Sequence, residues 1–118
     1  ENTFLNINWK FIKYQRIKNS KYLSDKLSKF SKINFINVKH NHFPLNFFLL
    51  TNKRESLKKY LFKKGIYTSI HWKIKSDKKF PSCSKLSSQI LSLPIDQRYS
   101  LRHMRYILES LKTYDKNF

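Results

Sequence analysis

Few residues of this 118-residue chain have the type and spacing that a chemical site requires. His40 and His42 form a His-x-His pair, but a metal site needs three or four converging ligands, and no cysteine or carboxylate lies near the pair in sequence. Cys83 has no histidine near it in sequence, so we expect a small buried or half-buried thiol and no nucleophile. A single glycine excludes a P-loop and a dinucleotide fingerprint. The residues alone therefore provide no complete catalytic set.

Two short segments hold the remaining candidates for a binding site. Alternation along a predicted strand from Tyr67 to Trp72 puts Tyr67, Ser69 and His71 on one face. Taken in isolation, His71 is an ordinary strand histidine, and Tyr67 and Trp72 pack a sheet face more often than they touch a ligand. Arg98 follows the Leu93-Pro94 strand end, where it could bind an anionic group or be a solvated loop arginine.

Helical periodicity and end signals predict the elements that position these residues. The stretch from Phe4 to Phe30 is consistent with one or two amphipathic helices, and Pro81 to Ser88 with a short one. Asn52 and Glu55 form a capping-box-like signature for a helix that closes on Gly65, where glycine tolerates positive φ. Ser100 caps a last helix, in which Arg102 and His103 oppose the macrodipole without evident function. The apolar face of that helix comprises Leu101, Met104, Ile107, Leu108 and Leu111.

Three strands are expected, at 45–51, 67–72 and 90–93, with 31–43 as an irregular or partly extended connector. The length suits one domain, and 40% hydrophobic residues can form a modest core. We expect no membrane-spanning segment, because the longest nearly apolar run is far below the roughly 20 residues that a span requires. One cysteine fits a reducing cytoplasm.

The net charge of +18 favours contact with polyanions. The 25 basic residues comprise 20 lysines and five arginines spread along the chain, whereas selective recognition of bases and phosphates tends to use the planar guanidinium of arginine. Alanine is absent and valine occurs once, while lysine, asparagine and isoleucine are inflated together, as mutational drift in an AT-rich genome produces. We expect any nucleic-acid binding to be weak, insensitive to sequence and strongly reduced by salt. A free-standing protein that binds nucleic acid or another polyanion is the alternative function.

Two runs in the second half of the chain carry a family resemblance. Gly65-Ile-Tyr-Thr-Ser-Ile-His-Trp72 and Ile90-Leu-Ser-Leu-Pro-Ile-Asp-Gln-Arg-Tyr-Ser100, in this order, resemble the C-terminal part of the DegT/DnrJ/EryC1/StrS sugar aminotransferases, and the likeness extends from about Arg16 to Leu111. The chain departs from the family at Lys73, where proline is common, and in a short loop from Lys73 to Lys79.

The resemblance implies a fold and a function. The fold is a two-layer α/β small domain, with a short antiparallel sheet backed by helices, as in the C-terminal domain of aspartate-aminotransferase-fold enzymes. Residues 1–118 would be one such domain, with 1–15 as the linker helix region. The parent chemistry is transfer of an amino group, usually from glutamate, to a nucleotide-linked keto sugar. Pyridoxal phosphate (PLP), its Schiff-base lysine and most phosphate ligands belong to a large N-terminal domain, which is not in this sequence.

The resemblance also implies site residues and partners. A histidine at the position of His71 faces the active-site cleft, near the cofactor and the sugar. Substrate contacts are expected from His71 on this ground and, as secondary candidates from the residues themselves, from Tyr67 and Arg98. No residue of the chain is expected to be catalytic or to bind a metal. The expected partners are the large PLP-binding domain, a homodimer partner and a nucleotide-sugar substrate. The chain, which begins at Glu1, would be an excised domain, a proteolytic product or a truncated gene product, and not catalytic alone.

Overall fold

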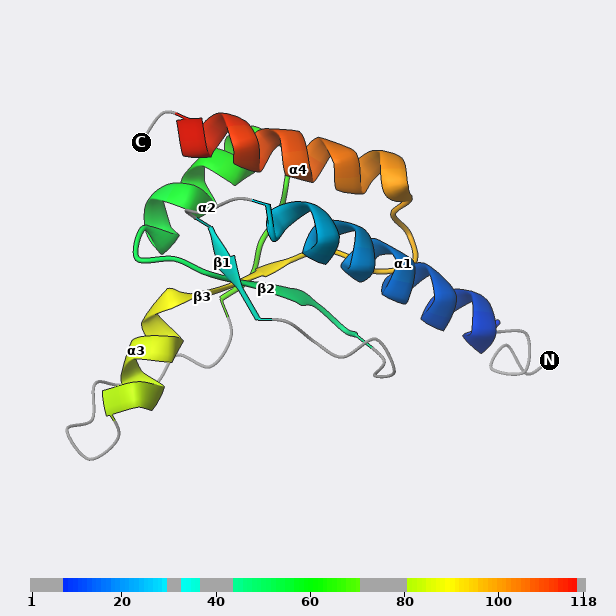
Figure 1. The fold of residues 1–118 in the computed structure, drawn as a ribbon, viewed down its shortest axis with the longest axis horizontal. Coiled ribbons are helices and arrows are strands. Elements are labelled where there is room, and N and C mark those ends of the chain that lie inside the picture. Colours follow the sequence, from blue (N-terminus) through cyan, green and yellow to red (C-terminus); the bar gives the residue numbers. More distant parts are fainter. Residues whose placement is uncertain (1–7, 30–32, 37–43, 71–80, 117–118) are drawn as a thin grey trace.

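A computed structural model describes residues 8–29, 33–36, 44–70 and 81–116 of the chain. Three helices lie over one face of a small antiparallel sheet. A fourth helix lies apart from them and leads directly into the last strand, as Figure 1 shows. The helices are α1 (Trp9–Leu27), α2 (Arg54–Lys63), α3 (Pro81–Gln89) and α4 (Leu101–Lys116). The strands are β1 (Asn34–Phe35), β2 (Phe47–Leu50) and β3 (Ile90–Leu93). The predicted fold class, a short antiparallel sheet backed by helices, is confirmed.

The sheet has the order β1-β2-β3 and is antiparallel throughout. Phe47 pairs with Leu93 and Leu50 with Ile90, so the four residues of β2 match the four of β3. Alternation sends Phe47 and Leu49 to the helices, and both are buried. In β3 all four residues are buried, and this strand is paired with β2 on one side and bridged to Ser69 through Ser92 on the other.

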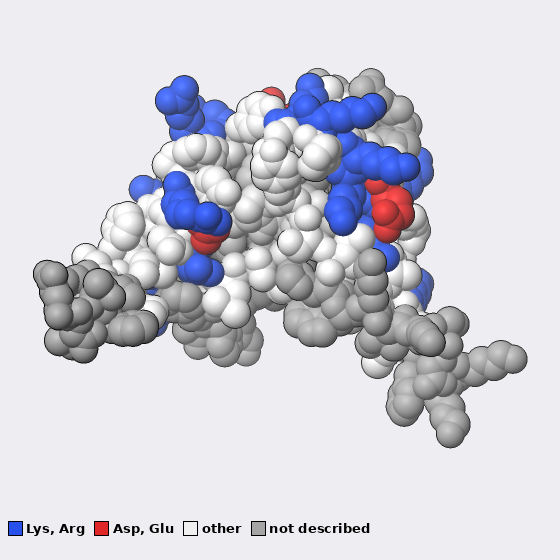
Figure 2. Space-filling model, turned by 180° about the vertical axis from the view of Figure 1, so that it is seen from behind, with Lys and Arg blue, Asp and Glu red and all other residues white. Residues whose placement is uncertain are grey.

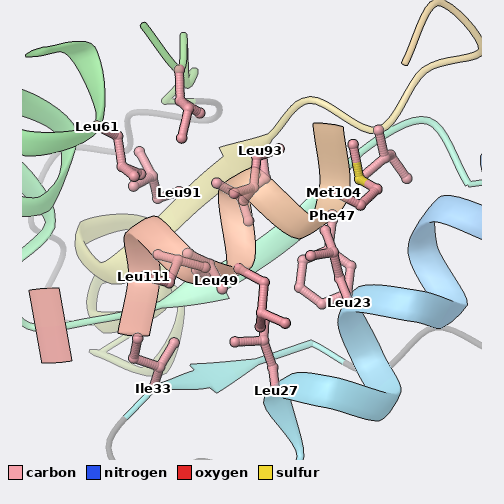
Figure 3. Packing of buried hydrophobic residues seen from close by; sticks show 14 of the residues in the cluster. Leu23, Leu27, Ile33, Phe47, Leu49, Leu61, Leu91, Leu93, Met104 and Leu111 are labelled. Carbon is pink, nitrogen blue, oxygen red and sulfur yellow. The ribbon is translucent and has the colours of Figure 1, made fainter. Parts of the chain in front are cut away.

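The core lies between the sheet and helices α1, α2 and α4 (Figure 3). Each helix contributes apolar residues that recur at three- or four-residue spacing, as in an amphipathic helix. The buried helix residues are Leu23 and Leu27 of α1, Leu57 and Leu61 of α2, and Met104, Ile107, Leu108 and Leu111 of α4. The apolar face predicted for the last helix is thus confirmed for these four residues of α4.

One strand prediction needs correction. Residues 67–70, the described part of the predicted strand 67–72, form only an isolated bridge between Ser69 and Ser92. The third strand of the sheet is instead β1, a pair of residues inside the predicted connector. Two residues are too few for an alternation signal, so β1 is set by its pairing with β2 and not by a local pattern.

The ends of the helices differ from the sequence prediction in two places. α2 begins at Arg54 after Lys53, which makes no side-chain cap, and the Asn52 side chain accepts a hydrogen bond from Gln89 instead, so the predicted capping box is wrong. α4 does begin directly after Ser100, but there the backbone N–H of Ser100 donates to Nδ1 of His103 at 3.1 Å. His103, to which the sequence assigned no evident function, therefore accepts the hydrogen bond of a backbone N–H at the start of α4.

Gly65 ends α2 as predicted, with φ of 79°. The N–H of Gly65 donates to the carbonyl of Phe62 at 3.0 Å, and the N–H of Ile66 to that of Leu61 at 2.9 Å. These two bonds form a Schellman motif, accompanied by burial of both Leu61 and Ile66. The direction in which the chain leaves α2 is therefore fixed by backbone bonds and by an apolar contact.

Candidate functional site

A polar pocket of about 370 Å³ opens beside the bridge between Ser69 and Ser92. Its walls come from residues 45–46 before β2, from Tyr67 and Ser69, and from the end of β3 and the loop after it. The lining includes serine hydroxyls, the Asn46 amide, the Asp96 carboxylate and the Arg98 guanidinium. Such a set can hydrogen-bond a ligand rich in hydroxyl groups.

Tyr67 reaches the pocket because backbone bonds fix its segment. Ser69 N–H donates to Ser92 carbonyl at 3.1 Å, and Ser92 N–H to Ser69 carbonyl at 2.9 Å. Alternation then leaves Ser69 exposed and Tyr67 68% exposed, whereas Ile70 packs against the core. The predicted facing of Tyr67, Ser69 and Ile70 is confirmed, although the segment is a bridge and not a full strand.

Arg98 lines the same pocket but is already paired with a carboxylate. Its Nε and a terminal nitrogen donate to the two Asp96 oxygens at 3.0 and 2.8 Å, and its backbone N–H donates to Oδ1 at 3.0 Å. The side-chain hydrogen bond from Arg98 is the main cause that lowers the pKa of Asp96, and the same bond raises the pKa of Arg98. An anionic ligand would have to share Arg98 with Asp96.

Asn19 fixes the loop that carries Arg98. Asn19 is fully buried in α1, and its Nδ2 donates to the carbonyls of Ile95, Asp96 and Tyr99 at 3.0, 3.3 and 2.9 Å. Gln15 adds a bond to the Tyr99 carbonyl at 2.9 Å. Our sequence reasoning missed Asn19. A signal existed, because Asn19 lies in line with Leu23 and Leu27 at helical spacing, on an apolar face where an amide needs partners.

A second hollow, the aromatic pocket, adjoins the polar pocket. Its volume is about 190 Å³, and Tyr67, Pro94 and Tyr99 line both hollows. Tyr106 and His103 of α4 close its other side; the Tyr106 hydroxyl donates to the Lys64 carbonyl at 2.6 Å. The Tyr99 and His103 rings meet edge to face at 5.4 Å. This pocket offers ring faces where the polar pocket offers hydrogen-bonding groups.

The other candidates have different outcomes. His71, Trp72 and the pair of His40 and His42 lie outside the described residues, so their predicted places stay predictions. Cys83 is exposed on α3, which corrects the expectation of a buried or half-buried thiol. Over the described ranges, no cluster of three potential metal ligands occurs, and no helix is long and apolar enough to cross a membrane.

No protein-family model matches this chain, and no curated protein matches its sequence. Solved structures do match it in fold. S. venezuelae DesV in complex with a ketimine intermediate aligns with a TM-score of 0.79 at 16% identity, over 87% of this chain and 32% of DesV. A protein of Streptococcus pneumoniae described as a sugar aminotransferase, in its apo form, aligns with a TM-score of 0.76 at 16% identity, over 90% of this chain and 31% of its own.

A DegT DnrJ EryC1 StrS aminotransferase from Brucella abortus aligns with a TM-score of 0.73 at 16% identity, over 87% of this chain and 31% of its own. The S. pneumoniae protein is also known in a PLP form and a PMP form. The present chain spans about a third of the length of these structures. The resemblance to this family is thus confirmed at the level of the fold.

Proposed function

We propose that this chain acts as the small domain of a PLP-dependent nucleotide-sugar aminotransferase, where it shapes the substrate cleft and is not catalytic alone. The observation that carries the proposal is the alignment of 87% of the chain with about a third of DesV, together with a polar pocket on the aligned fold. The amino-group transfer itself requires the large domain, and a homodimer partner is proposed on the same ground.

The residues of the polar pocket do not fit the covalent attachment of PLP. Attachment requires a desolvated lysine and a set of donors for the phosphate. No lysine is among the described residues that line the pocket, and its one cation, Arg98, is held by Asp96. The chemistry of the cofactor therefore has to be supplied by the large domain, and the part left to this chain is binding and orienting the sugar.

Three residues are proposed to bind that substrate: Tyr67, Arg98 and His71. Tyr67 and Arg98 are brought to one pocket from positions 31 residues apart in sequence. Tyr67 and Ser69 both line this pocket, and strand-like alternation favours the same side for the next alternate residue, His71. A phenol, a guanidinium and an imidazole can each hydrogen-bond a sugar hydroxyl or a phosphate.

The test replaces His71 and its neighbour Ile70 in an enzyme that contains this chain with its large domain. We expect His71→Ala to lower kcat/KM for the nucleotide sugar with little change in melting temperature. The matched control, Ile70→Ala, should lower the melting temperature because Ile70 packs against the core. If His71→Ala unfolds the domain and leaves kcat/KM unchanged in the surviving enzyme, His71 is a core residue and the site assignment is wrong.

The parent enzyme is tested separately by borohydride reduction of the natural polypeptide after incubation with PLP, followed by peptide mapping. We expect the label on a lysine outside the 20 lysines of this sequence. A label on one of these 20, or no cofactor binding by the natural polypeptide, would contradict the proposed division of labour.

A further inference from the structure

Exposed aromatic rings lie at the aromatic pocket and beside it. Phe62, Tyr67 and Tyr106 are 64%, 68% and 51% exposed. The Phe62 and Tyr67 rings contact each other edge to face, with centroids 5.5 Å apart. Tyr106 lines the pocket opposite Tyr67 and is anchored through its hydroxyl to Lys64. Two exposed rings, Tyr67 and Tyr106, thus line the hollow, and a third, Phe62, extends the exposed aromatic surface beside Tyr67, where a flat ligand can stack.

Basic side chains flank these rings. Lys59 and Lys63 lie one helical turn apart on α2, both exposed, and Lys59 precedes Phe62 by three residues. Arg102, exposed at the start of α4, precedes Tyr106 by four residues and so lies on the same side of the helix. No carboxylate among the described residues pairs with Lys59, Lys63 or Arg102. In Figure 2, lysine and arginine side chains gather in separate groups around a broad uncharged area.

We propose that this stacking surface, formed by Phe62, Tyr67 and Tyr106 with Lys59, Lys63 and Arg102, binds single-stranded nucleic acid. Unpaired bases stack on exposed aromatic rings regardless of sequence, while lysine and arginine contact the phosphates. The net charge of +18 attracts the strand over a longer range. This function needs neither a second domain nor PLP, and it shares Tyr67 with the proposed sugar site.

The arrangement favours a single strand over other anionic partners. In a duplex the base faces are already stacked, so the rings of Phe62 and Tyr67 would add nothing. An anionic membrane calls for segregated apolar and basic faces on a helix, whereas here the lysines of α2 alternate with Phe62 along the same exposed side. An acidic polypeptide complements the charges but not the rings.

The binding test is fluorescence anisotropy with the purified chain and a labelled oligothymidylate of about ten nucleotides. One stacked ring is worth about 1–3 kcal/mol, so Phe62→Ala should weaken binding roughly 5- to 150-fold. The matched control is Phe11→Ala, which removes a 51% exposed phenylalanine from α1 and should change the affinity by less than about twofold. Thermal melting checks that both variants fold, and Tyr67→Ala is a second variant of the surface.

The salt dependence of the affinity distinguishes a local binding site from general electrostatic attraction by the whole chain. Loss of one phosphate contact lowers the steepness of log K against log salt by about 0.7 for a single strand. We expect this change for Lys63→Gln and none for Lys13→Gln, an exposed lysine of α1.

Several results would overturn the proposal. Equal effects of Phe62→Ala and Phe11→Ala, or no effect of Phe62→Ala and Tyr67→Ala, would remove the stacking surface. Polyglutamate, or a duplex of the same length, could bind as tightly as the oligothymidylate at equal salt. That result would show that charge alone causes the binding. Thymidine monophosphate could displace the labelled oligomer as effectively as the unlabelled oligomer does. That result would indicate that the aromatic pocket binds a free nucleotide and not a strand.

Discussion

Replacing Asn19 with alanine should destabilise the fold by disconnecting α1 from the loop that carries Arg98. The Asn19 amide donates to three carbonyls, and the variant leaves that of Ile95 without this donor, whereas that of Asp96 keeps the N–H of Tyr99 and that of Tyr99 keeps Gln15. A buried acceptor left unsatisfied costs about 1–3 kcal/mol. With a small cavity added, we expect Asn19→Ala to lower the free energy of unfolding by about 2–4 kcal/mol.

Urea unfolding of the purified chain, followed by circular dichroism and extrapolated linearly to water, measures this loss. Gln15→Ala is the matched control: it removes a half-buried bond to the Tyr99 carbonyl, which Asn19 still satisfies, and a bond to Asn19 Oδ1, so the loss should be smaller than for Asn19→Ala, about 1–2 kcal/mol. Asn19→Asp should be worse than Asn19→Ala, because a buried carboxylate that only accepts would face three carbonyl oxygens. Equal losses below about 0.5 kcal/mol for Asn19→Ala and Gln15→Ala would refute this reasoning.

Three further predictions concern other parts of the chain. Gly65→Ala should cost about 1–2 kcal/mol in urea unfolding, from backbone strain at φ of 79° alone, because a Cβ there meets no atom within 4 Å, and Gly65→Asn should cost less; equal costs would point to a steric cause. The pKa of Asp96 is lowered on folding, so the Asp96–Arg98 pair stabilises the fold above the unfolded pKa near 3.8, and this contribution is lost as the pH falls through the folded pKa. The difference in the free energy of unfolding between the wild-type chain and Asp96→Asn should therefore become smaller as the pH is lowered from 7 to below 3.8. A difference that stays constant with pH would contradict this coupling of stability to the protonation of Asp96. Borohydride treatment of the isolated chain with PLP should label no single lysine stoichiometrically, because attachment needs an anchored cofactor; one labelled lysine would show that this chain holds the cofactor itself.

The sequence by itself determined the elements whose signals are local. Ile90–Leu93 is a short apolar run bounded by turn residues, and its predicted limits equal those of β3. The single glycine marked the end of α2, since only a residue free of a Cβ takes positive φ without strain. The apolar spacing from Met104 to Leu111 predicted the buried face of α4. Each of these signals is carried by residues within a few positions of the feature they specify.

Only the tertiary structure decided the features that depend on distant partners. β1 exists because Asn34 and Phe35 pair with β2, and Asn52 gives up a local cap for a bond to Gln89, 37 residues away. Asn19 finds its acceptors 76 to 80 residues along the chain. The sequence identified Tyr67 and Arg98 as candidates, but no local pattern indicated that they line one pocket. Local propensity and periodicity report on neighbours in sequence, whereas pairing, buried polar bonds and pockets depend on how the elements pack.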